Sequence, residues 1–337
     1  MDAVLGLPDL LKTRRTAQDQ NLVKDALDRA VRELSTGLKE DRVKASGGDT
    51  ARLAALDRNI GAIEARQPVL AMALARADAA QTAMTAIREQ VADLGPRLMD
   101  TVTNATSYGI ETMGAQAEVS LRLSLGALNT QVSGRSVFGG ALGAEETFAS
   151  ADDVIALVRA ALNSDPDLTV ALAAVDAIFA PGGDFDTQIY RGSTADAPLV
   201  DIGRGERVNA SVRGDDAETF RDLIKGMAMA AALVGTPLAD DLSKVERVFR
   251  SAGEAVIVGV DNLVKTEARL GAVEQELMKV QARDSAERTA LSITRADLIG
   301  ADIEEVSVRV RNLEAQLNLI YAVTARTMGL SFLNYMR

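Results

Sequence analysis

The chain of 337 residues contains no histidine, no cysteine and no tryptophan. Without histidine there is no imidazole for a catalytic triad or for a metal site. Without cysteine there is no disulfide, thiolate nucleophile, zinc finger or iron–sulfur ligand. Most enzyme classes therefore lack their usual groups, and we expect a protein that is not an enzyme and that holds no cofactor or metal.

Positive charge and aromatic residues are also scarce. Lysine and arginine number 37 against 48 acidic residues, a formal charge of −11. That balance argues against a nucleic-acid partner, because phosphate binding needs a basic face. Only 3% of residues are aromatic, so we expect a core of small aliphatic side chains that suit close helix packing.

Long apolar runs are missing as well. No segment approaches the roughly 18 apolar residues of a spanning helix, so we expect no membrane insertion. In MDAVLGLPDLLKTRR the apolar residues are broken by Pro8 and Asp9, and the basic residues follow them. This is not the order of a cleaved signal peptide, so we expect any export to proceed without one.

Heptad spacing near the C-terminus is the strongest pattern that is present. The apolar steps of 3, 4, 3, 4, 3 fall on Ile303, Val306, Val310, Leu313, Leu317 and Ile320. Similar spacing occurs upstream from Val256 to Val280. The pattern predicts one very long helix, or two nearly continuous helices, from about residue 250 to 330.

The N-terminal part has a matching pattern. Val23, Leu27, Ala30 and Leu34 step by 4, 3, 4 before Gly37. After the flexible segment 46–48, Asp49 or Thr50 is placed to cap a second helix over 50–94. Pro68 lies inside this helix, and we expect a kink or a break there. A third helix is predicted from after Pro96 to about Asn129.

The composition changes between about 131 and 249, where four of the seven prolines and many glycines lie. Helices are predicted at 151–162 and 219–234, and short strands at 188–191, 199–202 and 207–212, with a hairpin turn at 203–206. The fold class predicted is mainly α: a long antiparallel coiled coil or helical bundle of the terminal segments, with a small α+β domain inserted in the middle.

Several polar motifs have simple structural interpretations. Gly203-Arg204-Gly205 lacks the third glycine and the following helix of a nucleotide-binding loop. Asp184 and Asp186 are too few for a calcium loop and fit a solvated turn better. We interpret Asp215-Asp216 as preceding and capping a helix, and Glu304-Glu305 as a solvated helix face.

The heptad seams allow two interpretations. One is an antiparallel bundle that is complete as a monomer. The other is an interface that remains open until other subunits arrive. Periodicity alone favours neither.

Specific strings resemble the flagellin superfamily. Leu34-Ser35-Thr36-Gly37 is similar to the LSTG turn after the first helix, and 39–56 is similar to the stretch that follows it. The segment 46–50 departs from the usual proline-containing form. Within the superfamily, Ser136-Val137-Phe138-Gly139-Gly140, the run from Tyr190 to Phe220 and the aromatic ending over 330–336 most resemble the hook–filament junction proteins (hook-associated protein 3).

The resemblance implies a structural subunit that joins hook to filament and is exported unfolded through the flagellar type III channel to the extracellular flagellum. Implied partners are other hook-associated proteins, flagellin subunits, copies of itself in a ring and an export chaperone on the C-terminal helix. Flagellin itself and a secreted coiled-coil effector remain alternatives.

The predicted domains are a terminal coiled coil over 1–45 and 300–337, a long-helix bundle over 46–130 and 250–299, and a surface-exposed insert over 131–249. The expected assembly interface comprises Val23, Leu27, Leu34, Val310, Leu313, Leu317, Ile320, Phe332 and Tyr335.

Overall fold

The computed structural model describes residues 7–101, 106–141, 146–216 and 219–335, without the side chains of 7–13, 107 and 327–335. Helices dominate, and the two sheets within this part of the chain are two-stranded and antiparallel. This confirms the predicted fold class. The chain forms two compact units, Met1–Glu64 with Asp284–Arg337 and Ala65–Arg283. The three predicted domain boundaries remain a prediction.

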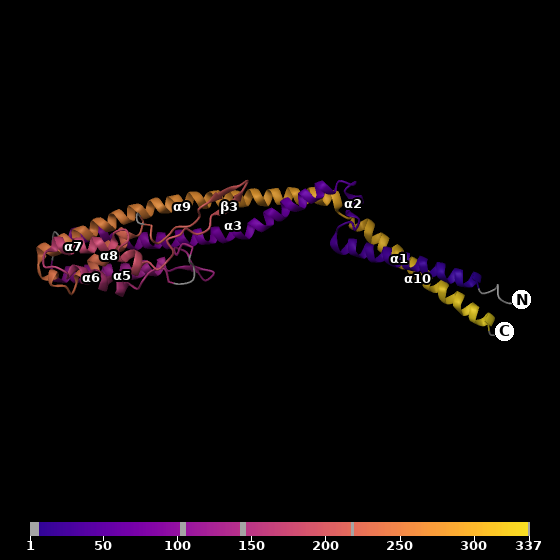
Figure 1. Ribbon diagram of the computed structural model, residues 1–337, viewed down its shortest axis with the longest axis horizontal. Coiled ribbons are helices and arrows are strands. Elements are labelled where there is room, and N and C mark those ends of the chain that lie inside the picture. The colour runs from indigo at the N-terminus through magenta and orange to yellow at the C-terminus, as the bar shows by residue number, and fades with distance from the viewer. Residues whose placement is uncertain (1–6, 102–105, 142–145, 217–218, 336–337) are drawn as a thin grey trace. The chain divides into compact units, whose positions relative to one another are not determined.

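The first unit contains the two chain ends (Figure 1). Its elements are α1 (Leu7–Thr36), α2 (Arg42–Ala45), the beginning of α3 (Thr50–Val91), the end of α9 (Leu242–Ile299) and α10 (Ile303–Tyr335). Helix α1 ends where predicted, because Gly37 adopts φ +67°, which glycine tolerates best. The Asp49 carboxylate caps α3 by accepting the Arg52 N–H at 3.0 Å, also as predicted.

The second unit is built on the remainder of α3 and α9. Between them in sequence lie α4 (Leu94–Thr101), α5 (Ser107–Leu128), β1 (Gln131–Val132), β2 (Arg135–Ser136), α6 (Ala151–Leu162), α7 (Leu168–Phe179), the π-helical turn η2 (Phe185–Ile189), β3 (Val200–Gly203), β4 (Glu206–Val208), α8 (Arg221–Leu233) and the 3-10 turn η3 (Pro237–Asp240).

Helix α8 lies at the centre of the second unit. Eleven of its 13 residues are buried, and it packs against α5 and α6. It also contacts α9 closely: a Cβ on Gly259 would lie 2.7 Å from the Leu223 nitrogen. Small residues therefore permit the close packing that the composition predicts.

The core of the second unit is more aromatic than we expected. Phe138, Phe148, Phe185, Phe220 and Phe249 are all fully buried. The rings of Phe138 and Phe220 meet edge to face, with their centroids 5.5 Å apart. The few aromatic residues are thus concentrated where the chain builds its largest hydrophobic core.

Of the kink or break predicted at Pro68, the structure shows no break: helix α3 continues through this residue, and buried residues on both sides, Ile63 and Leu70, stabilise it. The helix predicted to follow Pro96 was wrong in its bounds. Helix α4 begins at Leu94 and includes Pro96 near its start, where a missing N–H costs little. The helix predicted to continue to Asn129 is divided between α4 and α5, and residues 102–105 lie outside the description.

The middle segment also differs in detail. Residues 188–191 form the end of η2 and an isolated bridge from Tyr190 to Phe148, not a strand. Helix α7 and the β1–β2 hairpin were not predicted. Strands β3 and β4 pair through the predicted turn, where Gly203, Arg204 and Gly205 all have positive φ.

Candidate functional site

The predicted interface residues lie on two helices that pack against each other within the first unit. Helices α1 and α10 run side by side (Figure 1). Val23, Leu27 and Leu34 on α1 are partly buried. The same holds for Val310, Leu313, Leu317 and Ile320 on α10. Phe332 and Tyr335 belong to α10, but their side chains lie outside the description.

Polar contacts fix the near ends of these two helices. The Arg309 Nη1 lies 3.1 Å from the Glu33 Oε2. The Lys39 N–H donates to the Ile299 carbonyl, and the Ala301 N–H donates to the Gly37 carbonyl, each at 2.9 Å. The loop after α1 is therefore hydrogen-bonded to the loop between α9 and α10.

Apolar side chains on both of these helices are also exposed. Leu22 is 65% exposed and Leu319 is 66% exposed. We call these and similar residues the outer apolar set: Leu22, Val31, Val308, Leu319, Tyr321 and Val323. Single exposed apolar residues are ordinary, but this set lies on both members of a two-helix pair.

Little of this two-helix segment is fully buried. Among its described side chains, only Ala30 on α1 and Val306 on α10 are buried. Both large hydrophobic clusters belong to the second unit, over residues 70–280. Two packed helices leave much of each helix surface open, so α1 and α10 have apolar area available for further packing.

The outer apolar set was missed from the sequence because its members lie outside the heptad seam. The available signal was the run Leu319, Tyr321 and Val323, where apolar residues continue beside the seam positions 317 and 320. A helix with apolar residues on more than one face can contact more than one neighbour.

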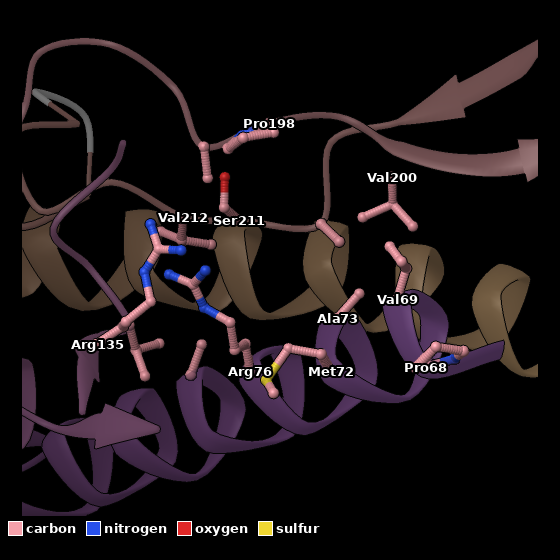
Figure 2. Close-up of a pocket in the computed structure, with 14 residues that line it drawn as sticks. Pro68, Val69, Met72, Ala73, Arg76, Arg135, Pro198, Val200, Ser211 and Val212 are labelled. Atoms are coloured by element: carbon pink, nitrogen blue, oxygen red, sulfur yellow. The ribbon is translucent and has the colours of Figure 1, made fainter. Parts of the chain in front are cut away.

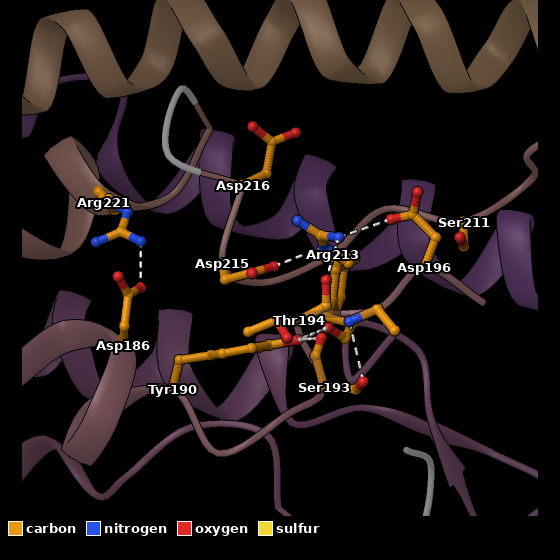
Figure 3. Close-up of polar contacts among 12 residues, drawn as sticks. Asp186, Tyr190, Ser193, Thr194, Asp196, Ser211, Arg213, Asp215, Asp216 and Arg221 are labelled. Atoms are coloured by element: carbon orange, nitrogen blue, oxygen red, sulfur yellow. Dashed lines mark hydrogen bonds and ion pairs between the residues drawn. The ribbon is translucent and has the colours of Figure 1, made fainter. Parts of the chain in front are cut away.

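The polar motifs of the second unit are occupied in internal contacts. Arg213 donates to Asp215 at 2.8 Å, to Asp196 at 2.9 Å and to the Thr194 carbonyl at 2.6 Å (Figure 3). The Tyr190 hydroxyl donates to the Ser193 carbonyl at 2.9 Å. Burial and the nearby Asp215 charge raise the pKa of Tyr190, so this phenol remains a hydrogen-bond donor and does not act as a base.

The acidic candidates have similar internal roles. Asp186 pairs with Arg221 (Figure 3). The guanidinium carbon of Arg221 lies 4.4 Å from the centre of the Phe185 ring. Asp184 accepts from Gln188 at 2.7 Å. No group of three or more carboxylates within the described ranges is placed to hold a metal ion.

The prediction that the Asp215 and Asp216 side chains cap a helix was wrong, because α8 begins at Arg221 without a side-chain cap. Asp215 pairs with Arg213, and Asp216 lies 3.2 Å from Arg269. The backbone carbonyl of Asp216 accepts the Thr219 N–H at 3.0 Å.

Glu304 and Glu305 are exposed, as predicted, and Glu305 pairs with Arg309 on the same helix. No helix in the described part of the chain is long and apolar enough to cross a membrane.

Comparisons with known proteins give a fold but no sequence family. No protein-family model matches the chain, and no curated protein does so. A solved structure described as a flagellar hook-associated protein of Vibrio parahaemolyticus aligns with a TM-score of 0.52 and 12% identity, over 74% of this chain and 96% of that chain. A second solved structure, Bacillus cereus FlgL, aligns with a TM-score of 0.39 and 12% identity, over 73% and 96%. The first comparison shows a shared fold.

Proposed function

We propose that this protein is a structural subunit of the bacterial flagellum that joins the hook to the filament and assembles through α1 and α10. The observation that carries the proposal is the contrast between the units. The second unit has a complete hydrophobic core, whereas α1 and α10 pair with partly exposed seams and an outer apolar set. The fold shared with the Vibrio hook-associated protein supports the same role.

Packing in an assembly stabilises helices that are marginal in the free subunit. Most helical stability in proteins comes from tertiary packing, not from intrinsic propensity. Burying one leucine contributes about 1.5–3 kcal/mol, and each subunit of a ring repeats the contact. The ordering of α1 and α10 is then offset by the apolar area that neighbouring subunits bury.

The proposed partners follow from this role. Neighbouring copies in a ring, other hook-associated proteins and flagellin subunits would cover the seam and the outer apolar set. An export chaperone would cover the C-terminal helix before assembly, and the chain would reach the extracellular flagellum unfolded through the type III channel. The absence of cysteine suits a chain that must remain unfolded during export, since no disulfide can lock it early.

Two alternatives to a junction protein, a flagellin and a secreted coiled-coil effector, predict a different location on the cell. A flagellin would be distributed along the whole filament. A secreted coiled-coil effector would not form ordered assemblies with hook or filament subunits.

A gold-labelled antibody against residues 131–249 on intact cells tests these alternatives directly. The proposal predicts a single band where hook meets filament. Label along the filament would identify a flagellin, and flagella without label would contradict a flagellar role. A strain that lacks the protein provides the control for antibody specificity.

A further inference from the structure

A cavity of about 370 Å³ lies in the second unit, beside α3. One wall is formed by α3, and the other by the chain around Pro198 and Val212 (Figure 2). Its lining is mainly apolar and includes Met72, Ala73 and Val200. Cavities of about 300–1,000 Å³ with apolar walls and a few convergent polar groups are typical of small-ligand sites.

Large apolar side chains are exposed at this cavity. Val69 is 50% exposed and Met72 is 46% exposed, and both line it. Pro68 and Pro198 line it too and are also exposed. These residues present apolar surface on both walls of the cavity, which a ligand would remove from water.

Two arginines provide the charge at one end of the cavity. The guanidinium groups of Arg76 and Arg135 lie next to each other (Figure 2). Arg76 donates one hydrogen bond, at 2.9 Å, to the Ser136 carbonyl. Arg135 reaches the Ala141 carbonyl only at 3.4 Å. Each guanidinium has five N–H donors, so both retain donors for a ligand.

No acidic side chain within the described ranges forms an ion pair with either arginine. Partial burial and the neighbouring Arg135 charge lower the pKa of Arg76, although a guanidinium remains protonated at neutral pH. The like charges repel, and an anion placed between them would remove that repulsion. Arginine pairs are well suited to carboxylates, which accept two parallel N–H bonds from one guanidinium.

We propose that this cavity binds a small amphipathic carboxylate. Its head group would accept hydrogen bonds from Arg76 and Arg135, and its apolar chain would lie against Met72, Val200 and Val212. This site is independent of the proposed assembly role, since it uses no residue of α1 or α10.

Calorimetric titration of the full chain with sodium decanoate tests the site. We expect saturable binding with one ligand per chain. Acetate, which has the head group without the chain, and decyltrimethylammonium, which has the chain without the negative charge, should not saturate. Absent decanoate binding, or equal binding of the cationic analogue, would overturn the proposal.

Substitutions locate the binding. Arg135→Gln, at an exposed position, should weaken decanoate binding by about tenfold or more, the loss expected for one charge-assisted hydrogen bond. Arg76→Gln should do the same, and circular dichroism would verify its fold. Arg207→Gln is the matched control, because Arg207 is exposed on β4 and does not line the cavity. Unchanged affinity in Arg135→Gln, or an equal loss in Arg207→Gln, would contradict the assignment.

Discussion

Glu33 on α1 and Arg309 on α10 form an ion pair, with 3.1 Å between Oε2 and Nη1. The other carboxylate oxygen of Glu33 accepts the backbone N–H of Glu40 at 2.9 Å. One side chain thereby joins α1, the loop that follows it and α10. The Glu33 side chain is only 13% exposed, against 46% for Arg309, so it is the more constrained partner.

Glu33→Ala should loosen the terminal helices more than Arg309→Ala does. An exposed ion pair contributes only about 0.2–1 kcal/mol, and loss of Arg309 removes in addition only its exposed pair with Glu305 on the same helix, which contributes a few tenths of a kcal/mol. Loss of Glu33 also leaves the Glu40 N–H without its acceptor, which adds a further cost. Hydrogen exchange of α1 and α10 amides measures the difference. Equal acceleration in the two variants would show that the Glu40 contact has no stabilising effect.

Leu319→Asp should abolish incorporation into flagella while the free subunit remains folded. Leu319 is 66% exposed, so the aspartate costs little in the monomer, but it would place a charge against the neighbouring subunit. Leu317→Asp should also prevent incorporation and leave a soluble subunit. Motility and electron microscopy of the junction provide the readout.

Asn318→Asp is the matched control for both leucine variants. It adds the same charge on the same helix, at an exposed position that is already polar. We expect near-normal junctions in this variant. Normal motility and a normal junction with Leu317→Asp or Leu319→Asp would contradict assembly through α10.

The sequence predicted the helices at the two ends of the chain well because the spacing of their apolar residues is regular. The seam residues of α1 and α10 occur on helices that pack together, and the break between α9 and α10 falls at 300–302. Helix α7 was missed because Leu168–Phe179 is apolar almost throughout, which removes the helical period. The π-helical turn at 185–189 has no simple sequence signature.

Features that depend on distant contacts were beyond sequence reasoning. Arg76 and Arg135 lie far apart in the chain, and only packing of the second unit places them at one cavity. Pro68 indicated a kink or a break because local rules penalise proline inside a helix, and the helix is not broken there. Burial of Ile63 and Leu70 overrides that penalty.

Gly259→Ala should destabilise the second unit by about 1–3 kcal/mol. The new Cβ would lie 2.7 Å from the Leu223 nitrogen and 2.8 Å from its Cα, so α8 or α9 must move. Gly126→Ala is the matched control, since Gly126 is also helical and has nothing within 4 Å of the added Cβ. That substitution should stabilise α5 by up to about 1 kcal/mol. Thermal unfolding should therefore shift in opposite directions, and a destabilisation of similar size in both would contradict the close contact.

Glu274→Gln should stabilise the protein at pH 7. One carboxylate oxygen of Glu274 is buried without a hydrogen-bond partner. Burial, with a smaller contribution from Asp78, raises the pKa of Glu274. The folded state therefore binds this proton more tightly than the unfolded state, and stability is lost as pH rises from the unfolded pKa through the raised folded pKa.

The gain from Glu274→Gln should be about 0.5 kcal/mol at pH 7, small because the residue is partly exposed, and it should vanish below about pH 4. Glu276→Gln is the control, since Glu276 is exposed and pairs with Lys279 at 3.7 Å. Denaturant unfolding at pH 4 and pH 7 measures both. A gain that persists at pH 4 would show that the ionised carboxylate is not its cause.

Brief trypsin treatment of the free subunit should trim both ends and leave a core near residues 46–299. Cleavage requires local opening, and α1 and α10 bury little apolar area, so exposed sites such as Arg29 and Arg311 should be cut first. The adjacent part of α3 and α9 has additional support from the ion pairs of Arg288 with Glu64 and Arg295 with Asp57. Mass spectrometry of the fragments identifies the boundaries.

Assembled subunits should resist the same treatment, because neighbours would cover α1 and α10. Resistant ends in the free subunit would instead indicate a bundle that is complete as a monomer.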